Sequence, residues 1–256
     1  MQIKSSFPSS HRFDKAFYMV MLVIIWAAIL SGFINDVIQK NAAGKLHFPI
    51  IVHVHAAAFV GWLLLFTTQI FLIRKRNYSL HKKLGMFGAV LAGLMVVLGI
   101  ITAVVSEHVK YGTPDSDPAF LAVMFGDMLL FGILSGAGIM LRKNAPAHKR
   151  MMLLATIVLT DAGMGRWFSF KIAPFFGNLY WTYHSFAQGF LPYIGFQMLP
   201  VLSLIIVVGI YDIITRRRLH SAYKFALLLY LSVYLIAGWL YFNPEWLKIA
   251  TKIIGH

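Results

Sequence analysis

The chain has 256 residues, of which 59% are hydrophobic and only 12% are charged. This composition excludes a soluble globular domain, which needs far more charged surface. The sequence contains no cysteine, which excludes disulfide bonds, thiolate metal sites and thiol catalysis. The net charge of +14 is also typical of nucleic-acid-binding proteins, but the placement of the basic residues argues against that function.

Seven apolar runs are long enough to cross a bilayer, for which a helix needs about 20 mostly apolar residues. They cover residues 16–34, 48–73, 84–106, 119–141, 151–172, 192–215 and 225–242. We therefore predict a single integral membrane domain over residues 1–256. Its predicted fold class is an all-α membrane protein, a bundle of seven transmembrane helices.

The basic residues gather in every second connection between these runs. Most of the 23 Lys and Arg residues lie in the N-terminal tail and around residues 74–83, 142–150 and 216–224. This alternation follows the positive-inside rule. It predicts a bacterial inner membrane protein with a cytoplasmic N-terminus and a periplasmic or extracellular C-terminus. The predicted partner of the basic connections is a layer of anionic lipid headgroups on the cytoplasmic side, not nucleic acid. The sequence identifies no protein partner.

A short repeat relates the three basic connections. Each has a helix end, a basic turn, a histidine and a helix start, and the histidines are His81, His148 and His220. One interpretation is three tandem helical hairpins preceded by one N-terminal helix. The other is convergence, because every cytoplasmic turn favours basic residues. We interpret the three histidines as headgroup contacts and not as ligands.

Ionisable residues inside apolar runs are costly and are therefore candidate functional residues. The second run holds His53 and His55, the fourth holds Asp127, and the fifth holds Asp161 and Arg166. The predicted orientation places all five in the outer half of the membrane, which indicates one polar site there. Three interpretations stay open: a structural ion pair of Arg166 with either aspartate, a proton relay or substrate site, and a metal site.

A metal ion or haem b is the cofactor that such a site would hold. One histidine with Asp127 and Asp161 would supply nitrogen and oxygen ligands suited to zinc, iron or manganese. His53 and His55 point about 200° apart on a helix, so one of them faces the bundle, and we favour His55. Two further candidate ligands for a metal or haem on the same predicted side are His108 and His184. No catalytic residue is identified.

Several motifs in the second to fifth runs carry a family resemblance. They are His53-x-His55, Gln69, LHKKLG at residues 80–85, AHKRMMLLAT at 147–156, Asp161 and Arg166-Trp167. With these motifs the chain resembles a family of uncharacterised bacterial multi-pass membrane proteins, which has no established activity to carry over. The second and third runs also resemble small membrane proteins grouped near the b-type cytochromes. This sequence lacks the paired intramembrane histidines that those cytochromes use.

Three functions follow from these observations. The leading hypothesis is a membrane protein with a polar site in the outer half of the bundle that binds a metal or haem and has a redox-type role. The second is a small proton-coupled transporter or channel-like protein, in which Asp127 and Asp161 take up protons or substrate. The third is an accessory subunit of a membrane complex, in which the ion pair is structural. Whether the protein is an enzyme stays open.

Overall fold

The computed structural model describes residues 7–8, 10–44, 48–171, 193 and 197–256. Within these ranges the chain is all-α and contains no strand. The helices are α1 (Asp14–Ala42), α2 (Ile50–Arg74), α3 (Tyr78–Lys110), the 3-10 turn η1 (Pro118–Phe120), α4 (Leu121–Met140), α5 (Ala145–Val158), α6 (Asp161–Lys171), α8 (Leu199–Arg216), α9 (Ser221–Tyr241) and α10 (Pro244–Ile253).

Six of these segments are long and apolar enough to cross a membrane: α1, α2, α3, η1 with α4, α8 and α9. They are apolar around most of their circumference, and many aliphatic side chains on their outer surfaces are exposed. A helix of this kind lies in lipid or in the interior of a large protein. The predicted all-α membrane class is therefore confirmed, whereas the predicted count of seven spans is not.

The fifth predicted run is divided between α5 and α6, which have 14 and 11 residues. The break falls at Leu159 and Thr160, where the chain forms a turn. The Thr160 hydroxyl donates a hydrogen bond to the carbonyl of Ile157 at 2.6 Å, and such a side-chain bond competes with the regular helix. Gly163 and Gly165 follow soon after, and glycine is a weak helix former. Each half is consequently too short to cross a bilayer alone.

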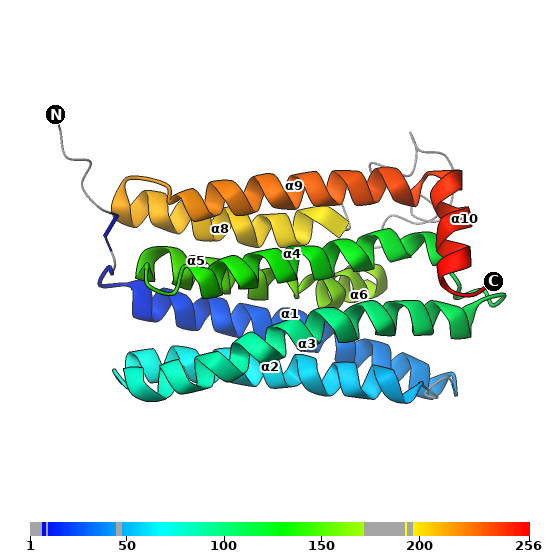
Figure 1. Ribbon diagram of the computed structural model, residues 1–256, viewed down its shortest axis with the longest axis horizontal. Coiled ribbons are helices and arrows are strands. Elements are labelled where there is room, and N and C mark those ends of the chain that lie inside the picture. Colours follow the sequence, from blue (N-terminus) through cyan, green and yellow to red (C-terminus); the bar gives the residue numbers. More distant parts are fainter. Residues whose placement is uncertain (1–6, 9, 45–47, 172–192, 194–196) are drawn as a thin grey trace.

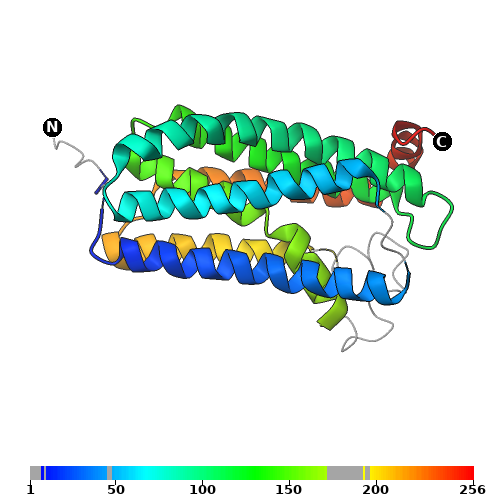
Figure 2. The same cartoon turned by 90° about the horizontal axis from the view of Figure 1, so that it is seen from below.

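The long helices run side by side along one axis, and α10 lies across one end of the bundle (Figures 1 and 2). The α2–α3, α4–α5 and α8–α9 connections lie together with the start of α1 at the other end. We call this end, with residues 75–77, 141–144 and 217–220, the basic end. The end that carries α10 is called the opposite end. The basic connections that alternate along the sequence therefore lie together at one end of the molecule.

Helices α1 and α6 cross with their backbones in contact at two glycines. A methyl group on Gly32 would collide with the carbonyl oxygen of Gly163. A methyl group on Gly163 would in turn lie 2.6 Å from the carbonyl oxygen of Ala28. Small residues allow this close approach, and lipid tails provide no hydrophobic force that could replace such packing. The contact positions α6, and with it the break in front of α6, against the first helix.

Candidate functional site

Two helices bring a carboxylate and a phenol together inside the bundle. The Tyr234 hydroxyl of α9 donates a hydrogen bond to Asp127 Oδ1 of α4 at 2.6 Å. Tyr234 is 1% exposed. Next to Asp127, Gly126 lets α9 approach, because a methyl group there would lie 3.1 Å from Val233. The two residues are thus held by close packing between α4 and α9.

A second carboxylate lies at the break between α5 and α6. Asp161 is the first residue of α6 and is 3% exposed. Its Oδ1 atom is buried and has no hydrogen-bond partner among the described residues. Asp161 is close enough to Asp127 and Tyr234 to interact with them electrostatically, and the charges of the two aspartates interact. The two aspartates and Tyr234 therefore form one cluster, in which Tyr234 bonds to Asp127 and Asp161 Oδ1 remains available to a further donor.

Further tyrosines surround this pair. The Tyr230 and Tyr234 rings stack at 4.5 Å between centroids, and the Tyr230 hydroxyl donates to the Met198 carbonyl at 2.9 Å. The Tyr193 hydroxyl donates to the Tyr234 carbonyl at 3.1 Å. Buried groups therefore fix the cluster of Asp127, Asp161 and Tyr234 on several sides. We call the two aspartates of this cluster the carboxylate pair.

Arg166 is not the partner of this pair in the structure. Its Nε atom lies 3.5 Å from Asp36 Oδ2 of α1, and its guanidinium covers the Phe33 ring at 4.5 Å. Arg166 follows Asp161 by five residues, so the two side chains leave α6 about 140° apart. The ion pair expected between Arg166 and Asp161 or Asp127 is replaced by a pair between Arg166 and Asp36. Among the described residues, neither Asp161 nor the partly buried Asp127 has a directly bonded cation.

The candidate histidine ligands are spread over the molecule. His53 is exposed near Phe48, whereas His55 is half-buried and its Nδ1 atom has no partner among the described residues. The His108 Nδ1 atom lies 2.6 Å from the carbonyl oxygen of Ile254 at the opposite end. His184 lies outside the described residues. Over the described part of the chain, no three His, Asp or Glu side chains form a group that could hold a metal ion.

Within the described residues, a buried ion-pair network lies at the basic end, whose cations the sequence predicts to contact lipid headgroups. Arg150 Nε and Nη2 donate to Asp212 at 2.7 and 2.6 Å, and both side chains are 1% exposed. Arg216 bonds to Asp212 at 3.1 Å and to Asp14 at 2.6 Å. Lys149 also bonds to Asp14, at 2.7 Å. This network ties together the ends of α1, α5 and α8.

The pairing of Asp212 with Arg216 could have been predicted from the sequence. Asp212 precedes Arg216 by four residues, a spacing that places both side chains on one face of a helix. Nothing local indicates Asp14, which is 202 residues away from its partner Arg216.

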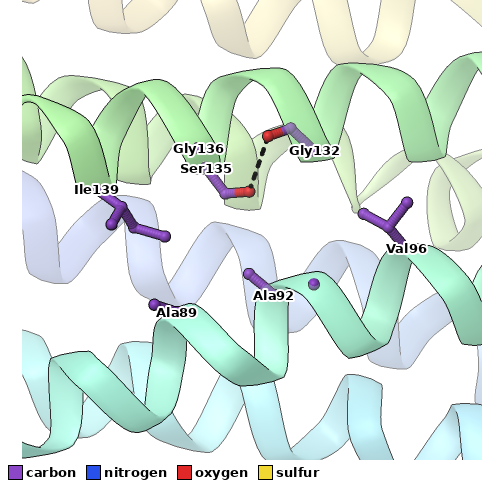
Figure 3. A pocket seen from close by; sticks show the side chains of 8 residues that line it. Ala89, Ala92, Val96, Gly132, Ser135, Gly136 and Ile139 are labelled. Atoms are coloured by element: carbon purple, nitrogen blue, oxygen red, sulfur yellow. Dashed lines mark hydrogen bonds between the residues drawn. The ribbon is translucent and has the colours of Figure 1, made fainter.

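A shallow groove of about 200 Å³ separates α3 and α4 (Figure 3). It is lined by Ala89, Ala92, Gly93 and Val96 of α3 and by Gly132, Ser135, Gly136 and Ile139 of α4. Its one polar side chain, Ser135, donates to the Phe131 carbonyl at 2.6 Å and approaches the Gly132 carbonyl at 3.4 Å. The groove is therefore apolar in character and is separate from the carboxylate pair.

No protein family model matches this chain, and no curated protein or solved structure shows significant similarity to it.

Proposed function

We propose that this chain is a small proton-coupled membrane transporter whose carboxylate pair binds and releases a proton. The observation that supports the proposal best is the Asp161 Oδ1 atom at a helix break near Asp127 and Tyr234, which has no hydrogen-bond partner within the described part of the chain. Two neighbouring carboxylates of low exposure repel each other when both are ionised, so one proton is shared between them. Buried carboxyl groups in transmembrane segments commonly act as proton carriers.

The broken helix supports the same function. Transporter sites are often built where a transmembrane helix is discontinuous, because the free backbone groups and the helix dipole then face the site. We propose that α5 and α6 together form one discontinuous pass. Their 25 residues would extend about 37 Å, which is enough for a hydrocarbon core of about 30 Å. This pass restores the seven crossings that the hydropathy pattern predicts.

The charge pattern supports a cytoplasmic basic end in a bacterial inner membrane. Under this proposal the N-terminus is cytoplasmic and the C-terminus is periplasmic or extracellular. The exposed cations Arg142, Lys143 and Arg217 then contact anionic headgroups. The carboxylate pair then lies in the outer half of the bundle, because Asp127 is six residues from the start of α4 and thirteen from its end.

Infrared spectroscopy of the purified protein tests the proton site directly. The wild type should show a protonated carboxyl band that disappears when the pH is raised. Asp127→Asn and Asp161→Asn should each remove or shift that band. Asp36→Asn is the matched control, because Asp36 is paired with Lys40 at 2.9 Å and should contribute no such band. A wild-type spectrum without a titrating carboxyl band would reject the proposal.

A flux measurement tests transport. Proteoliposomes that enclose a pH-sensitive dye, with an imposed membrane potential, would report proton entry through a channel-like protein without any substrate. A coupled transporter should show entry only after a substrate is added. Asp127→Asn and Asp161→Asn should abolish entry in either case, while Asp36→Asn should retain it. Equal rates in all of the variants would show that the pair is structural, as in an accessory subunit.

A further inference from the structure

Two of the basic connections place a histidine in the same local setting. Asn77 caps α3 and Asn144 caps α5, through side-chain oxygens that accept from Leu80 N and Ala147 N. Four residues after each cap, the backbone N–H of His81 or His148 donates to the carbonyl of its capping asparagine. The repeat seen in the sequence is thus a structural repeat in these two connections. It brings the rings of His81 and His148 to 6.2 Å between centroids, nearly perpendicular at 84°.

A carbonyl group determines which nitrogen of His148 is free. His148 Nδ1 lies 2.8 Å from the carbonyl oxygen of Gly138. A carbonyl oxygen only accepts, so Nδ1 carries the proton and Nε2 keeps its lone pair. Histidines that bind metals usually donate their second ring nitrogen in this way, which fixes the tautomer and the ring orientation.

Two buried polar atoms, one on His81 itself and one on the neighbouring Gln69, lack hydrogen-bond partners among the described residues. Gln69 Nε2 donates to the carbonyl of His81 at 3.2 Å, which fixes the orientation of the amide. Gln69 Oε1 and His81 Nδ1 are both buried and have no hydrogen-bond partner among the described residues. Buried polar atoms without partners are rare and usually indicate an ion, a ligand or a water that binds there. An amide oxygen can only accept, so it favours a Lewis acid or a proton donor over an anion.

The ring separation agrees with two imidazoles that share one metal. A metal–nitrogen bond of about 2.0–2.1 Å puts each ring centre roughly 3.2 Å from the metal, so two opposed rings lie up to about 6.4 Å apart. The observed 6.2 Å is close to this limit, so both nitrogens would lie on nearly opposite sides of the metal, and tetrahedral zinc would draw the rings about 1 Å closer. No third His, Asp or Glu of the described residues completes the group. The remaining positions would be taken by Gln69 Oε1, by water or by a second chelating group.

We propose that His81 and His148 bind one metal ion at the basic end, with Gln69 as a supporting ligand. The ligand is a metal centre that accepts two neutral imidazoles. This metal is either a free dication such as Zn²⁺ or the iron of a haem. Lys82 and Lys83 follow His81 directly, and their charges weaken binding of a bare dication and favour an anionic chelate. The site is distinct from the carboxylate pair and does not depend on its function.

Metal binding to the full chain, purified in mild detergent without a polyhistidine tag, tests the site. After treatment with a chelator, the protein would be titrated with Zn²⁺ against an indicator dye and, separately, with haemin. The visible spectrum would also be recorded as purified. We expect one metal per chain, and at least a tenfold loss of affinity in each of His81→Ala and His148→Ala. Gln69→Leu should cause a smaller loss. His53→Ala, which changes an exposed histidine on α2, is the matched control and should bind as the wild type does.

The two sources give different results. An absorbance band that both histidine variants lose would identify haem, whereas colourless, stoichiometric Zn²⁺ binding would identify a free dication. If an alanine variant fails to fold, as judged by gel filtration and melting temperature, His81→Gln and His148→Asn replace it. A wild type that binds neither Zn²⁺ nor haemin overturns the proposal. Unchanged affinity in both histidine variants does so as well.

Discussion

The guanidinium of Arg150 and the carboxylate of Asp212 form two hydrogen bonds of 2.7 and 2.6 Å, and both side chains are almost fully buried. Removing one partner of such a pair leaves an unpaired charge in a medium of low dielectric constant, at a cost of about 3–5 kcal/mol. We therefore expect Asp212→Leu to lower the melting temperature strongly. Arg150→Met combined with Asp212→Leu should be milder than Asp212→Leu alone. Thermal unfolding in detergent measures the melting temperatures of the single and double variants. An equal fall in melting temperature in both variants would contradict this expectation.

The contact between α1 and α6 predicts a second stability effect. In Gly32→Ala the new methyl group meets the backbone of Gly163, which cannot move aside as a side chain can. Overpacking of this kind costs about 1–3 kcal/mol. Gly136→Ala is the matched control, because no atom lies within 4 Å of a methyl group at that position. The two melting temperatures should differ clearly, with only Gly32→Ala below the wild type. Equal values would mean that α1 and α6 do not pack this closely.

The carboxyl group of Asp117, in the connection between α3 and α4, should make the stability of the fold depend on pH. Burial raises the pKa of this carboxyl above its usual 3.8, and the negative charge of Glu107 adds to the effect, while a hydrogen bond from Tyr241 at 2.8 Å opposes it. A raised pKa means that the folded state binds the proton more tightly than the unfolded state does. The contribution of Asp117 to stability is therefore largest below pH 3.8 and is lost as the pH rises through the folded-state pKa.

Asp117→Asn should remove this contribution. We expect the variant to gain stability at neutral pH relative to the wild type, because a neutral amide takes the place of a partly buried charge. Melting temperatures measured from mildly acidic to neutral pH would show a flatter profile for the variant. A variant that is less stable than the wild type at neutral pH would show that the bond to Tyr241 outweighs burial.

The membrane class was predictable because it depends on the length of apolar runs, which the sequence shows directly. The break at Thr160 was not, because hydropathy alone reads the run as continuous, although Thr160, Asp161, Gly163 and Gly165 are weak helix formers. Partners that are distant in sequence were also missed, as Asp14 with Arg216 shows. The sequence indicates Asp127 and Asp161 because they are ionisable groups in apolar runs, whereas Tyr234, which bonds to Asp127, could not be distinguished from other aromatic residues.

The histidines illustrate the same limit. The sequence favours separate headgroup contacts for His81 and His148 because each follows a basic turn, and their approach to 6.2 Å depends on the packing of α4 against both α3 and α5. A local sequence pattern describes the immediate neighbours of one residue, but it does not show which distant residues come into contact in the folded chain. The repeat itself was the usable signal, since two equivalent helix starts at one end of a bundle place equivalent side chains at the same depth.

The proposed orientation predicts which residues a membrane-impermeant thiol reagent reaches. The natural chain has no cysteine, so every single-cysteine variant gives an unambiguous signal. Lys143→Cys at the basic end should be labelled only after the membrane is opened, because the positive-inside rule puts this end in the cytoplasm. Thr113→Cys and Lys252→Cys, at exposed positions of the opposite end, should be labelled in intact cells. Labelling of Lys143→Cys in intact cells would show that the orientation is the opposite of the proposed one. Labelling of all three variants from one side would refute the membrane-spanning bundle.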